Sequence, residues 1–254
     1  MFGEERRMII MHTLEQRGSA SVSELATRFG VSEVTIRKDL EKLAGSELIE
    51  RTHGGAMLRR DRQFTLHYDL RGAELVGEKE AIGKAAAELV GAGETIIIDT
   101  GTTTIHLAKS LPPLHDLHCV TNDWQIATTL AIWPQITVTL TGGAVRTPLL
   151  PLWGADCERS ILSHREVDRT FLSISGISLD GGLTNTYAVE VGAKRAMIQV
   201  AREVILLVDS SKFGKVAPAF VADLTAVQKI IVGRQAPSEM VNRLTDMGIE
   251  VMLV

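Results

Sequence analysis

The sequence predicts an α/β protein that combines a small, mainly helical N-terminal domain with a larger domain built on a mostly parallel sheet. Residues 1–58 contain short amphipathic segments joined at "FGVS" and a closing hairpin pattern. In residues 75–254, short apolar β-branched runs alternate with helical segments, as in parallel sheets that helices cover on both faces. Residues 59–74 lie between these parts, and their polar, charged composition predicts a linker.

The composition limits the kinds of protein that this chain can be. A net charge of −4 gives no global sign of a nucleic-acid-binding protein, so any DNA contact has to come from the local placement of cations. Cys119 and Cys157 form neither a spaced metal motif nor a disulfide framework. The N-terminal stretch lacks the apolar run of a signal peptide, and no apolar run approaches the ~20 residues of a membrane span. We expect a cytoplasmic protein without a membrane segment, a metal site or a cofactor.

The first sixty residues have the pattern of a helix-turn-helix. Residues 4–17 predict a first helix, and "VSELATRFG" places four apolar side chains on one face of a second helix. Ser32 is the predicted N-cap of a third helix, and Gly45 is its predicted terminator. Gly30 stands where the turn between the second and third helices requires a positive φ.

The predicted third helix has an unusual outer surface. At about 100° per residue, Ile36 and Leu40 face inward, which leaves Val34 exposed beside Arg37. In the major groove of DNA, a valine can contact a thymine methyl group and an arginine can bind a guanine edge or a phosphate. The pattern therefore favours a DNA-recognition helix, and an ordinary three-helix bundle with mixed surface charge remains the alternative.

A β-hairpin is predicted directly after this helix. The stretch "SELIERTHGGAML" contains two short apolar runs separated by a basic segment and two glycines. Such a hairpin is a wing, and its basic residues can reach the DNA backbone or the minor groove, although a lone histidine is more often a turn residue. The predicted DNA contacts are Ser32, Val34, Thr35, Arg37, Lys38, Arg51 and His53.

The stretch "SVSELATRFGVSEVTIRKDLEKLAGSELIERTHGGAML" resembles the N-terminal signature of the DeoR family of bacterial sugar-metabolism repressors. The resemblance consists of a Val-x-Glu-Leu-Ala helix, a following "VS-x-x-TIR-(R/K)-DL" segment and an "HGGA" wing, without a gap. It implies a winged helix-turn-helix that binds double-stranded operator DNA. Lys38 stands where an arginine is usual, which keeps the charge but loses the planar guanidinium fork.

In the second domain, polar residues and glycines gather at the carboxyl ends of the predicted strands. Rossmann-like sheets bind ligands at this edge, so these residues are candidates for a single binding site. The candidates are Asp99, Gly101, Thr102, Thr103, Thr104, Asn122, Gly142, Gly143, Asp209 and Lys212, with Gly181, Gly182 and Thr184 in a loop on the same side.

The stretch "IIIDTGTTT", residues 96–104, allows several interpretations. Asp99 with the following Thr-Gly could be the triplet of an aspartic protease, but such proteases are all-β chains that bring two triplets together, whereas this triplet lies in a βα unit. A phosphatase of the "DKTGT" kind has an inserted residue and a second aspartate nearby, and both are absent. What remains is a turn at a helix N-terminus whose amides and hydroxyls can bind a phosphate. Asp99 would repel that phosphate, so we expect it to bind sugar hydroxyls or to orient the turn.

Glu190 and Lys194 lie four residues apart on a predicted helix. Residues at this spacing share a helix face, so the two side chains either form a surface ion pair or both point into the binding crevice. The sequence leaves both possibilities open.

The second domain also resembles the effector domain of the DeoR family, which is similar in fold to ribose-5-phosphate isomerase. The matching stretches include "EKEAIGKAA", "IDTGTTT", "VTN", "TGG", "GLT", the helix with Glu190 and Lys194, and "DSSKFG". The sequence departs from this resemblance at two places that would border the pocket: "TPLLPLWGAD" replaces a small, polar stretch, and Asp123 stands where serine is common.

These patterns together predict a DNA-binding repressor of a sugar catabolic operon that responds to a phosphorylated sugar or a related phosphate ester. It is expected to be a homodimer or a homotetramer, because helix-turn-helix proteins usually bind two related half-sites. The alternative is a sugar-phosphate isomerase with an attached DNA-binding domain, in which Glu190 or Asp99 is the base and Lys194 stabilises an enediolate. A third possibility is a DNA-bound scaffold whose second domain binds no ligand.

Overall fold

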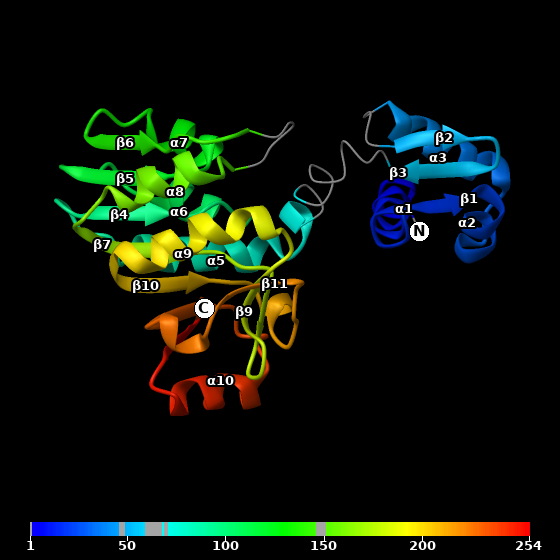
Figure 1. Cartoon of the computed structure of the whole chain (residues 1–254). Coiled ribbons are helices and arrows are strands. Elements are labelled where there is room, and N and C mark those ends of the chain that lie inside the picture. Colours follow the sequence, from blue (N-terminus) through cyan, green and yellow to red (C-terminus); the bar gives the residue numbers. More distant parts are fainter. Residues whose placement is uncertain (1, 46–48, 59–67, 69–70, 146–150) are drawn as a thin grey trace. The chain divides into compact units, whose positions relative to one another are not determined.

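The computed structural model describes residues 2–45, 49–58, 68, 71–145 and 151–254. The chain divides into two compact units, and the boundary between them lies between Glu74 and Leu75 (Figure 1). Most of the predicted linker, at 59–67 and 69–70, lies outside the described residues, whereas residues 71–73 are helical. In the described part of the chain, no helix has the length and apolarity needed to cross a membrane.

The first unit consists of three helices and a small antiparallel sheet of strand order β1-β3-β2. The predicted helices and hairpin are confirmed, and the strand β1 is an addition because its three residues are too few to show a pattern. The elements are α1 (Gly3–Arg17), β1 (Ser19–Ser21), α2 (Val22–Phe29), α3 (Glu33–Ala44), β2 (Ile49–Thr52) and β3 (Gly55–Leu58).

Local capping signals set the ends of these helices. The Ser21 hydroxyl accepts the Glu24 backbone N–H, and the Ser32 hydroxyl accepts that of Thr35 at 3.2 Å, as expected of N-caps. Gly30 ends α2 in the left-handed conformation with φ 64°, which glycine adopts without steric cost. Gly45 is the C-cap of α3, which confirms its predicted role as terminator, and it has the right-handed conformation.

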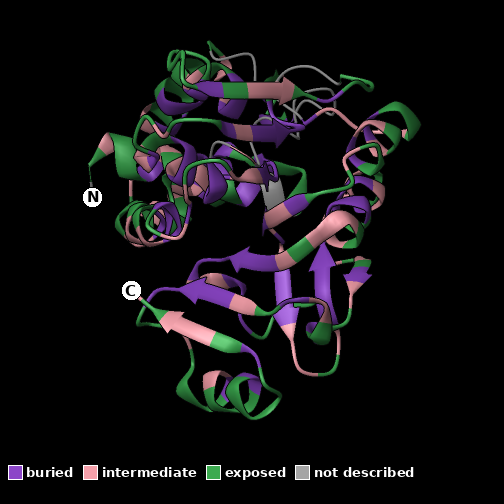
Figure 2. Ribbon diagram, turned by 90° about the vertical axis from the view of Figure 1, so that its left-hand side faces the viewer, coloured by how far each residue is buried: buried purple, intermediate pink, exposed green. Residues whose placement is uncertain are grey.

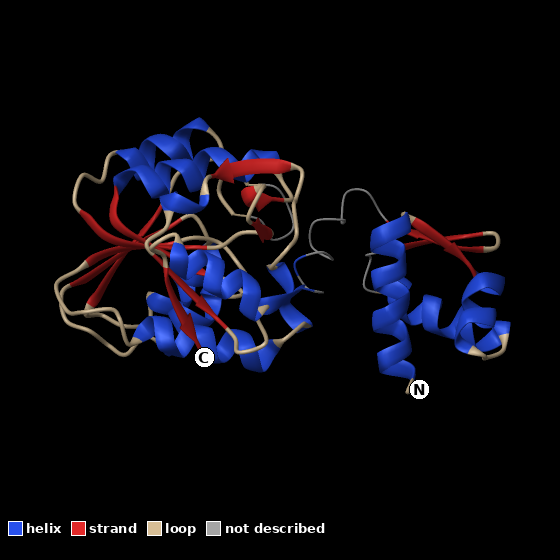
Figure 3. Cartoon of the chain, turned by 90° about the horizontal axis from the view of Figure 1, so that it is seen from below, coloured by secondary structure: helices blue, strands red, loops and turns tan. Residues whose placement is uncertain are grey.

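The second unit is a three-layer α/β/α structure (Figure 3). Its seven-stranded sheet has the order β13-β12-β10-β7-β4-β5-β6, and every described strand pair in it is parallel. Helices pack on both faces of the sheet. The elements are α5 (Val76–Ala87), β4 (Thr95–Ile98), α6 (Thr104–Ser110), β5 (Leu117–Thr121), α7 (Trp124–Leu130), β6 (Ile136–Leu140), α8 (Ala155–Leu162), β7 (Val167–Leu172), α9 (Val191–Val200), β10 (Ala201–Leu207), β12 (Lys229–Val232), α10 (Ser238–Asp246) and β13 (Glu250–Leu253).

Successive side chains of a strand point to opposite faces of the sheet, so each central strand contributes to the hydrophobic core on both faces. Ile96 and Ile98 pack with α5, α6 and α7, whereas Ile97 packs on the opposite face with α8, α9 and α10. All three isoleucines are fully buried, as are most residues of the central strands (Figure 2). This confirms the prediction of a parallel sheet with helices on both faces.

The glycine-rich loop predicted after the fourth strand of the sheet instead contains two strands of a small antiparallel sheet, whose third strand follows β10. This small sheet has the order β11-β9-β8, with β8 at Gly176–Ser178, β9 at Gly182–Asn185 and β11 at Ala219–Ala222. Strands of three or four residues interrupted by glycines carry almost no periodic signal, which explains why the pattern did not predict them.

The strand order has a topological switch point between β4 and β7. From β4 the chain builds outward through β5 and β6, returns to β7 on the other side of β4, and continues outward through β10, β12 and β13. In open α/β sheets, ligands bind at such a point, outside the carboxyl ends of the strands. The order therefore places the crevice of this sheet next to the residues that follow β4 and β7.

Candidate functional site

In the first unit, α3 presents the predicted DNA-contacting face to solvent. Val34 is 58% exposed, and Arg37 and Lys38 are exposed beside it, while Ile36 and Leu40 are buried in the core. The Arg37 guanidinium donates to the Glu33 carboxylate of the preceding turn at 2.5 Å. Because this pair is exposed, DNA can compete for Arg37 at little energetic cost.

The wing lies next to this helix. A small cavity of about 60 Å³ separates α3 from the β2–β3 hairpin, and Arg37, Arg51 and His53 line it together with Leu40. The geometry therefore brings a helix cation and two wing residues to one groove. Ser32 caps α3 and its hydroxyl lies 2.9 Å from that of Thr35, so these two residues occupy the N-terminal end of the same helix.

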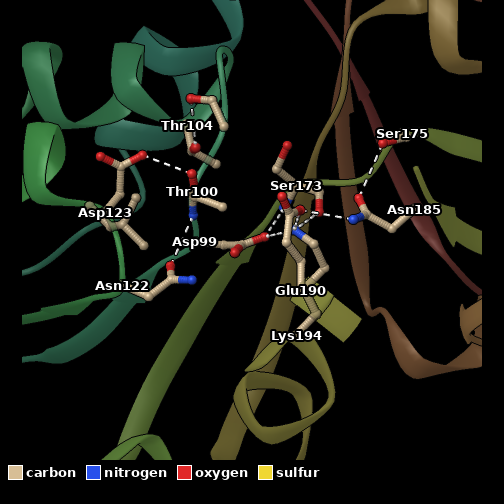
Figure 4. Close-up of polar contacts among 12 residues, drawn as sticks. Asp99, Thr100, Thr104, Asn122, Asp123, Ser173, Ser175, Asn185, Glu190 and Lys194 are labelled. Atoms are coloured by element: carbon tan, nitrogen blue, oxygen red, sulfur yellow. Dashed lines mark hydrogen bonds and ion pairs between the residues drawn. The ribbon is translucent and has the colours of Figure 1, made fainter. Parts of the chain in front are cut away.

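In the second unit, a buried ion pair occupies the switch point (Figure 4). Lys194 extends from α9 and donates to Asp99 Oδ2 at 2.6 Å and to the Ser173 carbonyl oxygen at 2.8 Å. The Ser173 backbone N–H donates to the same Asp99 oxygen at 3.0 Å. Asp99 follows β4 and Ser173 follows β7, so Lys194 joins the two strands that flank the crevice. The Lys194 side chain is 2% exposed.

Glu190 extends this cluster toward the small sheet. Its Oε2 lies 4.0 Å from Lys194 Nζ and accepts the side-chain N–H of Asn185 at 2.8 Å. Asn185 in turn accepts the Ser175 hydroxyl at 3.1 Å. The surface ion pair that the sequence left open for Glu190 and Lys194 is therefore wrong, because both side chains point into the cluster.

The electrostatics of Asp99 set it apart from an ordinary ion-pair partner. Burial raises the pKa of its carboxyl above the ordinary value, and the charge and hydrogen bond of Lys194 act against this rise. Asp99 Oδ1 is buried and has no hydrogen-bond partner among the described residues. A buried carboxylate oxygen without a donor is costly, and the hydroxyl of a bound ligand is the kind of group that can satisfy it.

A second set of hydrogen bonds fixes the residues on the other side of Asp99. Asn122 Oδ1 accepts the Thr100 backbone N–H at 3.2 Å, and Asp123 accepts the Thr100 hydroxyl at 2.8 Å. Asp123 also accepts the backbone N–H groups of Gln125 and Ile126, so it is the N-cap of α7. Burial raises the pKa of the Asp123 carboxyl. The Asp123 side chain therefore places a second buried carboxylate beside the turn that follows Asp99.

The turn from Gly101 to Thr104 is tightly packed. A Cβ atom on Gly101 would lie 2.5 Å from Ser173 Oγ, so the glycine allows the turn to approach β7. The Thr104 hydroxyl donates its hydrogen to the Gly101 carbonyl oxygen at 3.1 Å, so in this arrangement it cannot also donate to a phosphate. Thr103 is the N-cap of α6 without a side-chain cap hydrogen bond, and Thr102 and Thr103 are both buried.

The remaining predicted residues lie farther along the sheet. Asp209 follows β10, next to β7, and caps a short turn through the Ser211 N–H at 3.1 Å, while Lys212 Nζ lies 3.6 Å from Asp209 Oδ2. Gly142 and Gly143 follow the edge strand β6, and the described contacts connect neither to Asp99. Gly143 instead packs against the Trp153 backbone with φ 128°.

The glycine-rich candidates have a structural role. The Thr184 hydroxyl donates to the Gly176 carbonyl oxygen at 3.1 Å and accepts the Ala217 N–H at 2.9 Å. Gly181 and Gly182 form the β8–β9 turn, where Gly182 has φ 64°. These residues hold the small sheet together, and it is this sheet that supplies Asn185 to the cluster.

Sequence reasoning missed Ser173, Ser175 and Asn185. Ser173 directly follows the apolar run of β7, so the rule that selected Asp99 and Asn122 would have found it. Asn185 had no such signal, because its strand was not recognised. The described residues contain no group of histidine, cysteine, aspartate or glutamate side chains suited to a metal ion.

Two family models match this chain. The model of the DeoR-like helix-turn-helix domain matches residues 6–62, and the model of the DeoR C-terminal sensor domain matches residues 74–234.

Relatives match the chain over nearly its whole length. A glycerol-3-phosphate regulon repressor of Escherichia coli is 36% identical over 249 residues, which are 98% of this chain and 98% of that protein. A putative aga operon transcriptional repressor of Escherichia coli is 31% identical over 98% of this chain and 93% of its own. Among solved structures, a ribose 5-phosphate isomerase of Methanocaldococcus jannaschii is 17% identical over 53% of each chain, with a TM-score of 0.38, which is too low to support an inference.

Proposed function

Because this chain belongs to the DeoR family of transcriptional regulators, we propose that it represses a carbohydrate catabolic operon and releases its operator when a phosphorylated sugar binds to the second unit. The observation that supports effector sensing is the buried Lys194–Asp99 pair at the switch point, in which one carboxylate oxygen has no donor in the part of the chain that the structure describes. The names of the relatives, a glycerol-3-phosphate regulon repressor and a putative aga operon repressor, favour a carbohydrate-linked effector.

Residues 1–58 are the proposed DNA-binding domain, 59–74 the linker and 75–254 the effector-binding domain. The proposed partner of the first is double-stranded operator DNA, which Val34, Arg37 and the wing contact. A homodimer or a homotetramer supplies two such domains for two half-sites, and we place the protein in the cytoplasm, where the operator is.

The effector site is proposed to have two ends. Asp99, Glu190 and Asn122 would bind sugar hydroxyls, because carboxylate and amide oxygens accept hydrogen bonds from them. The phosphate would bind at the turn formed by residues 101–104, with Lys212 supplying a positive charge. Asp209, Gly142 and Gly143 would border the ends of the crevice, and Lys194 would hold Asp99 in place.

Release of the operator tests this proposal. An operator duplex selected from a random library by the protein itself would be labelled, and its fluorescence anisotropy followed with ribose 5-phosphate, glucose 6-phosphate, fructose 1-phosphate and glycerol 3-phosphate. We expect one of these to release the duplex while the unphosphorylated sugar does not. If the protein binds the duplex but none of these compounds releases it, the proposal that a sugar phosphate is the effector is wrong.

Aldose–ketose isomerisation is the second candidate function. Asp99, Glu190 and Lys194 are residue types that can move a proton and stabilise an enediolate, and they lie within one cluster. The relatives that match the whole chain are named transcriptional regulators, and we propose that this chain is likewise not an enzyme. If the purified protein formed a ketose from ribose 5-phosphate, it would be an isomerase, and this second candidate function would be correct.

A further inference from the structure

One side chain ties the first helix of the second unit to the carboxyl edge of the sheet. Glu78 lies in the first turn of α5, and its carboxylate accepts three hydrogen bonds from two separate loops. Oε1 accepts the backbone N–H of Ser210 at 2.6 Å and that of Gly233 at 3.1 Å, and Oε2 accepts the Ser210 hydroxyl at 2.9 Å. Ser210 comes after β10 and Gly233 directly follows β12.

Gly233 gives independent evidence that this contact is specific. A Cβ atom at Gly233 would lie 2.4 Å from Cδ of Glu78, so any other residue would push the carboxylate away. The backbone of Gly233 is not in the left-handed region. The glycine is therefore needed for the space that the Glu78 side chain occupies, and not for its own conformation.

The loop that Glu78 holds belongs to the proposed effector site. Ser210 is the residue between Asp209 and Ser211, and Asp209 accepts the Ser211 N–H while Lys212 donates to the Ser211 hydroxyl at 3.0 Å. Because the backbone N–H and the hydroxyl of Ser210 are both bound to one carboxylate, a displacement of the 209–212 turn pulls on the first turn of α5.

The start of α5 is also the start of the second unit. Its N-cap is Leu75, the residue that follows the boundary, and Leu75 has φ 49° and ψ 40°. A leucine in the left-handed region is uncommon, and residues at the ends of elements are the ones that absorb backbone rotations in hinge motions. A shift of the first turn of α5 would therefore act on the backbone that joins the two units.

We infer that Glu78 is a positioning residue that transmits effector binding at the 209–212 turn to the start of α5. It is required for operator release and dispensable for effector binding. This inference rests on the proposed function.

The test uses the full-length protein, its operator duplex and the sugar phosphate that releases the wild type most strongly. The test variants are Glu78→Ala, which removes the carboxylate, and Gly233→Ala, which displaces it. Glu78→Gln is the conservative control, since its amide oxygen can accept the two backbone N–H groups and its NH2 can donate to the Ser210 hydroxyl oxygen. Glu80→Ala removes an exposed carboxylate from about 200° around the same helix. Effector binding is measured by titration calorimetry without DNA, and operator release by anisotropy.

We expect all four variants to bind the sugar phosphate like the wild type. Glu78→Ala and Gly233→Ala should need at least about tenfold more of it to release the operator, since allosteric coupling is typically worth 5–150-fold. Glu78→Gln and Glu80→Ala should respond like the wild type. A purely structural role would lower the melting temperature and leave the ligand concentration needed for release unchanged.

Two results would contradict this inference and leave the proposed function intact. One is that Glu78→Ala releases the operator at the same ligand concentration as the wild type. The other is that Glu78→Ala no longer binds the effector, which would make the carboxylate part of the binding site. If no sugar phosphate released the wild type, the proposed function and this inference would fail together.

Discussion

Each unit of this protein contains a buried ion pair, and the two pairs differ in how completely they are satisfied. In the first unit, Arg6 donates to Asp39 Oδ2 at 2.6 Å and Arg7 lies 3.4 Å from Asp39 Oδ1, so both carboxylate oxygens have a partner. In the second unit, Lys194 and Ser173 both bind Oδ2 of Asp99, and Oδ1 is left without one among the described residues.

This difference indicates that the Asp39 pair only stabilises the fold, whereas the Asp99 pair is a candidate for ligand binding. The Asp39 pair connects α1 to the buried side of α3, away from the face that carries Val34 and Arg37, and both of its carboxylate oxygens are already bonded. The Asp99 pair lies where a Rossmann-like sheet binds ligands, and it leaves an acceptor for a ligand to fill. The combination of an unsatisfied buried oxygen and a position at the switch point is what distinguishes the Asp99 pair from the Asp39 pair.

The largest effect is expected from breaking the pair of the second unit. Lys194→Met leaves a fully buried carboxylate without its cation and should lower the free energy of unfolding by about 3–5 kcal/mol, measured by urea denaturation. The double variant Lys194→Met/Asp99→Leu should recover part of this loss, because it removes both charges. A loss below about 1 kcal/mol in the single variant would show that the pair is not buried in solution.

The same variant should become more sensitive to pH. Burial already raises the pKa of Asp99 above its ordinary value of 3.8, and loss of Lys194 removes a charge that lowers it. A carboxyl whose pKa is higher in the folded than in the unfolded state stabilises the fold at low pH, and this stability is lost as the pH rises through the folded pKa. Lys194→Met should therefore be more destabilised at pH 8 than at pH 5, and the reverse order would contradict this assignment.

A smaller effect is expected from the pair of the first unit. Asp39→Ala removes the acceptor of Arg6 and should destabilise the first unit by about 2 kcal/mol, the scale of a hydrogen bond to a charged group. Arg6 and Arg7 are less deeply buried than Asp99, so they can regain water. Hydrogen exchange should show faster opening in α1 and α3, with the amides of β4 and β7 unchanged.

The Glu33–Arg37 pair is exposed, so we expect its loss to affect stability less than the loss of either buried pair. Arg37→Ala should change the unfolding free energy by less than about 0.5 kcal/mol, because exposed ion pairs contribute little. It should weaken operator binding by about 1–3 kcal/mol if the guanidinium contacts a base, as measured by anisotropy at fixed salt. Glu33→Gln is the control and should not weaken binding. Unchanged affinity in Arg37→Ala would remove Arg37 from the interface.

The smallest effect is expected at Asp123. Asparagine can still accept the two N–H groups at the start of α7, but it does not ionise. Because burial raises the pKa of Asp123, wild-type stability falls as the pH rises through that pKa, and Asp123→Asn escapes this loss. The variant should gain in melting temperature relative to the wild type between pH 5 and pH 8, and a constant difference would show that Asp123 does not titrate there.

The sequence predicted those features that neighbouring residues determine. Ser32 caps its helix and Gly30 adopts a positive φ because their effects depend on residues within a few positions. The positions of Asp99, Asn122 and Asp209 after their strands could be predicted because strand ends can be recognised from apolar runs. The Lys194–Asp99 contact spans 95 residues and depends on the order of the strands, which no local pattern encodes. For the same reason the sequence could not decide where Glu190 and Lys194 point.

The distinction between the two pairs is tested most directly by ligand-induced stabilisation. With the sugar phosphate that releases the operator at 100 times its Kd, binding should stabilise the wild type and Asp39→Asn by about 2.7 kcal/mol each, measured as shifts of the thermal unfolding of the second unit. Asp99→Asn should show no shift, because its amide oxygen would accept from Lys194 and Ser173, and its NH2, a donor, would replace the oxygen proposed to accept the ligand hydroxyl. An equal shift in Asp99→Asn would contradict the account, since the ligand would then bind without this carboxylate.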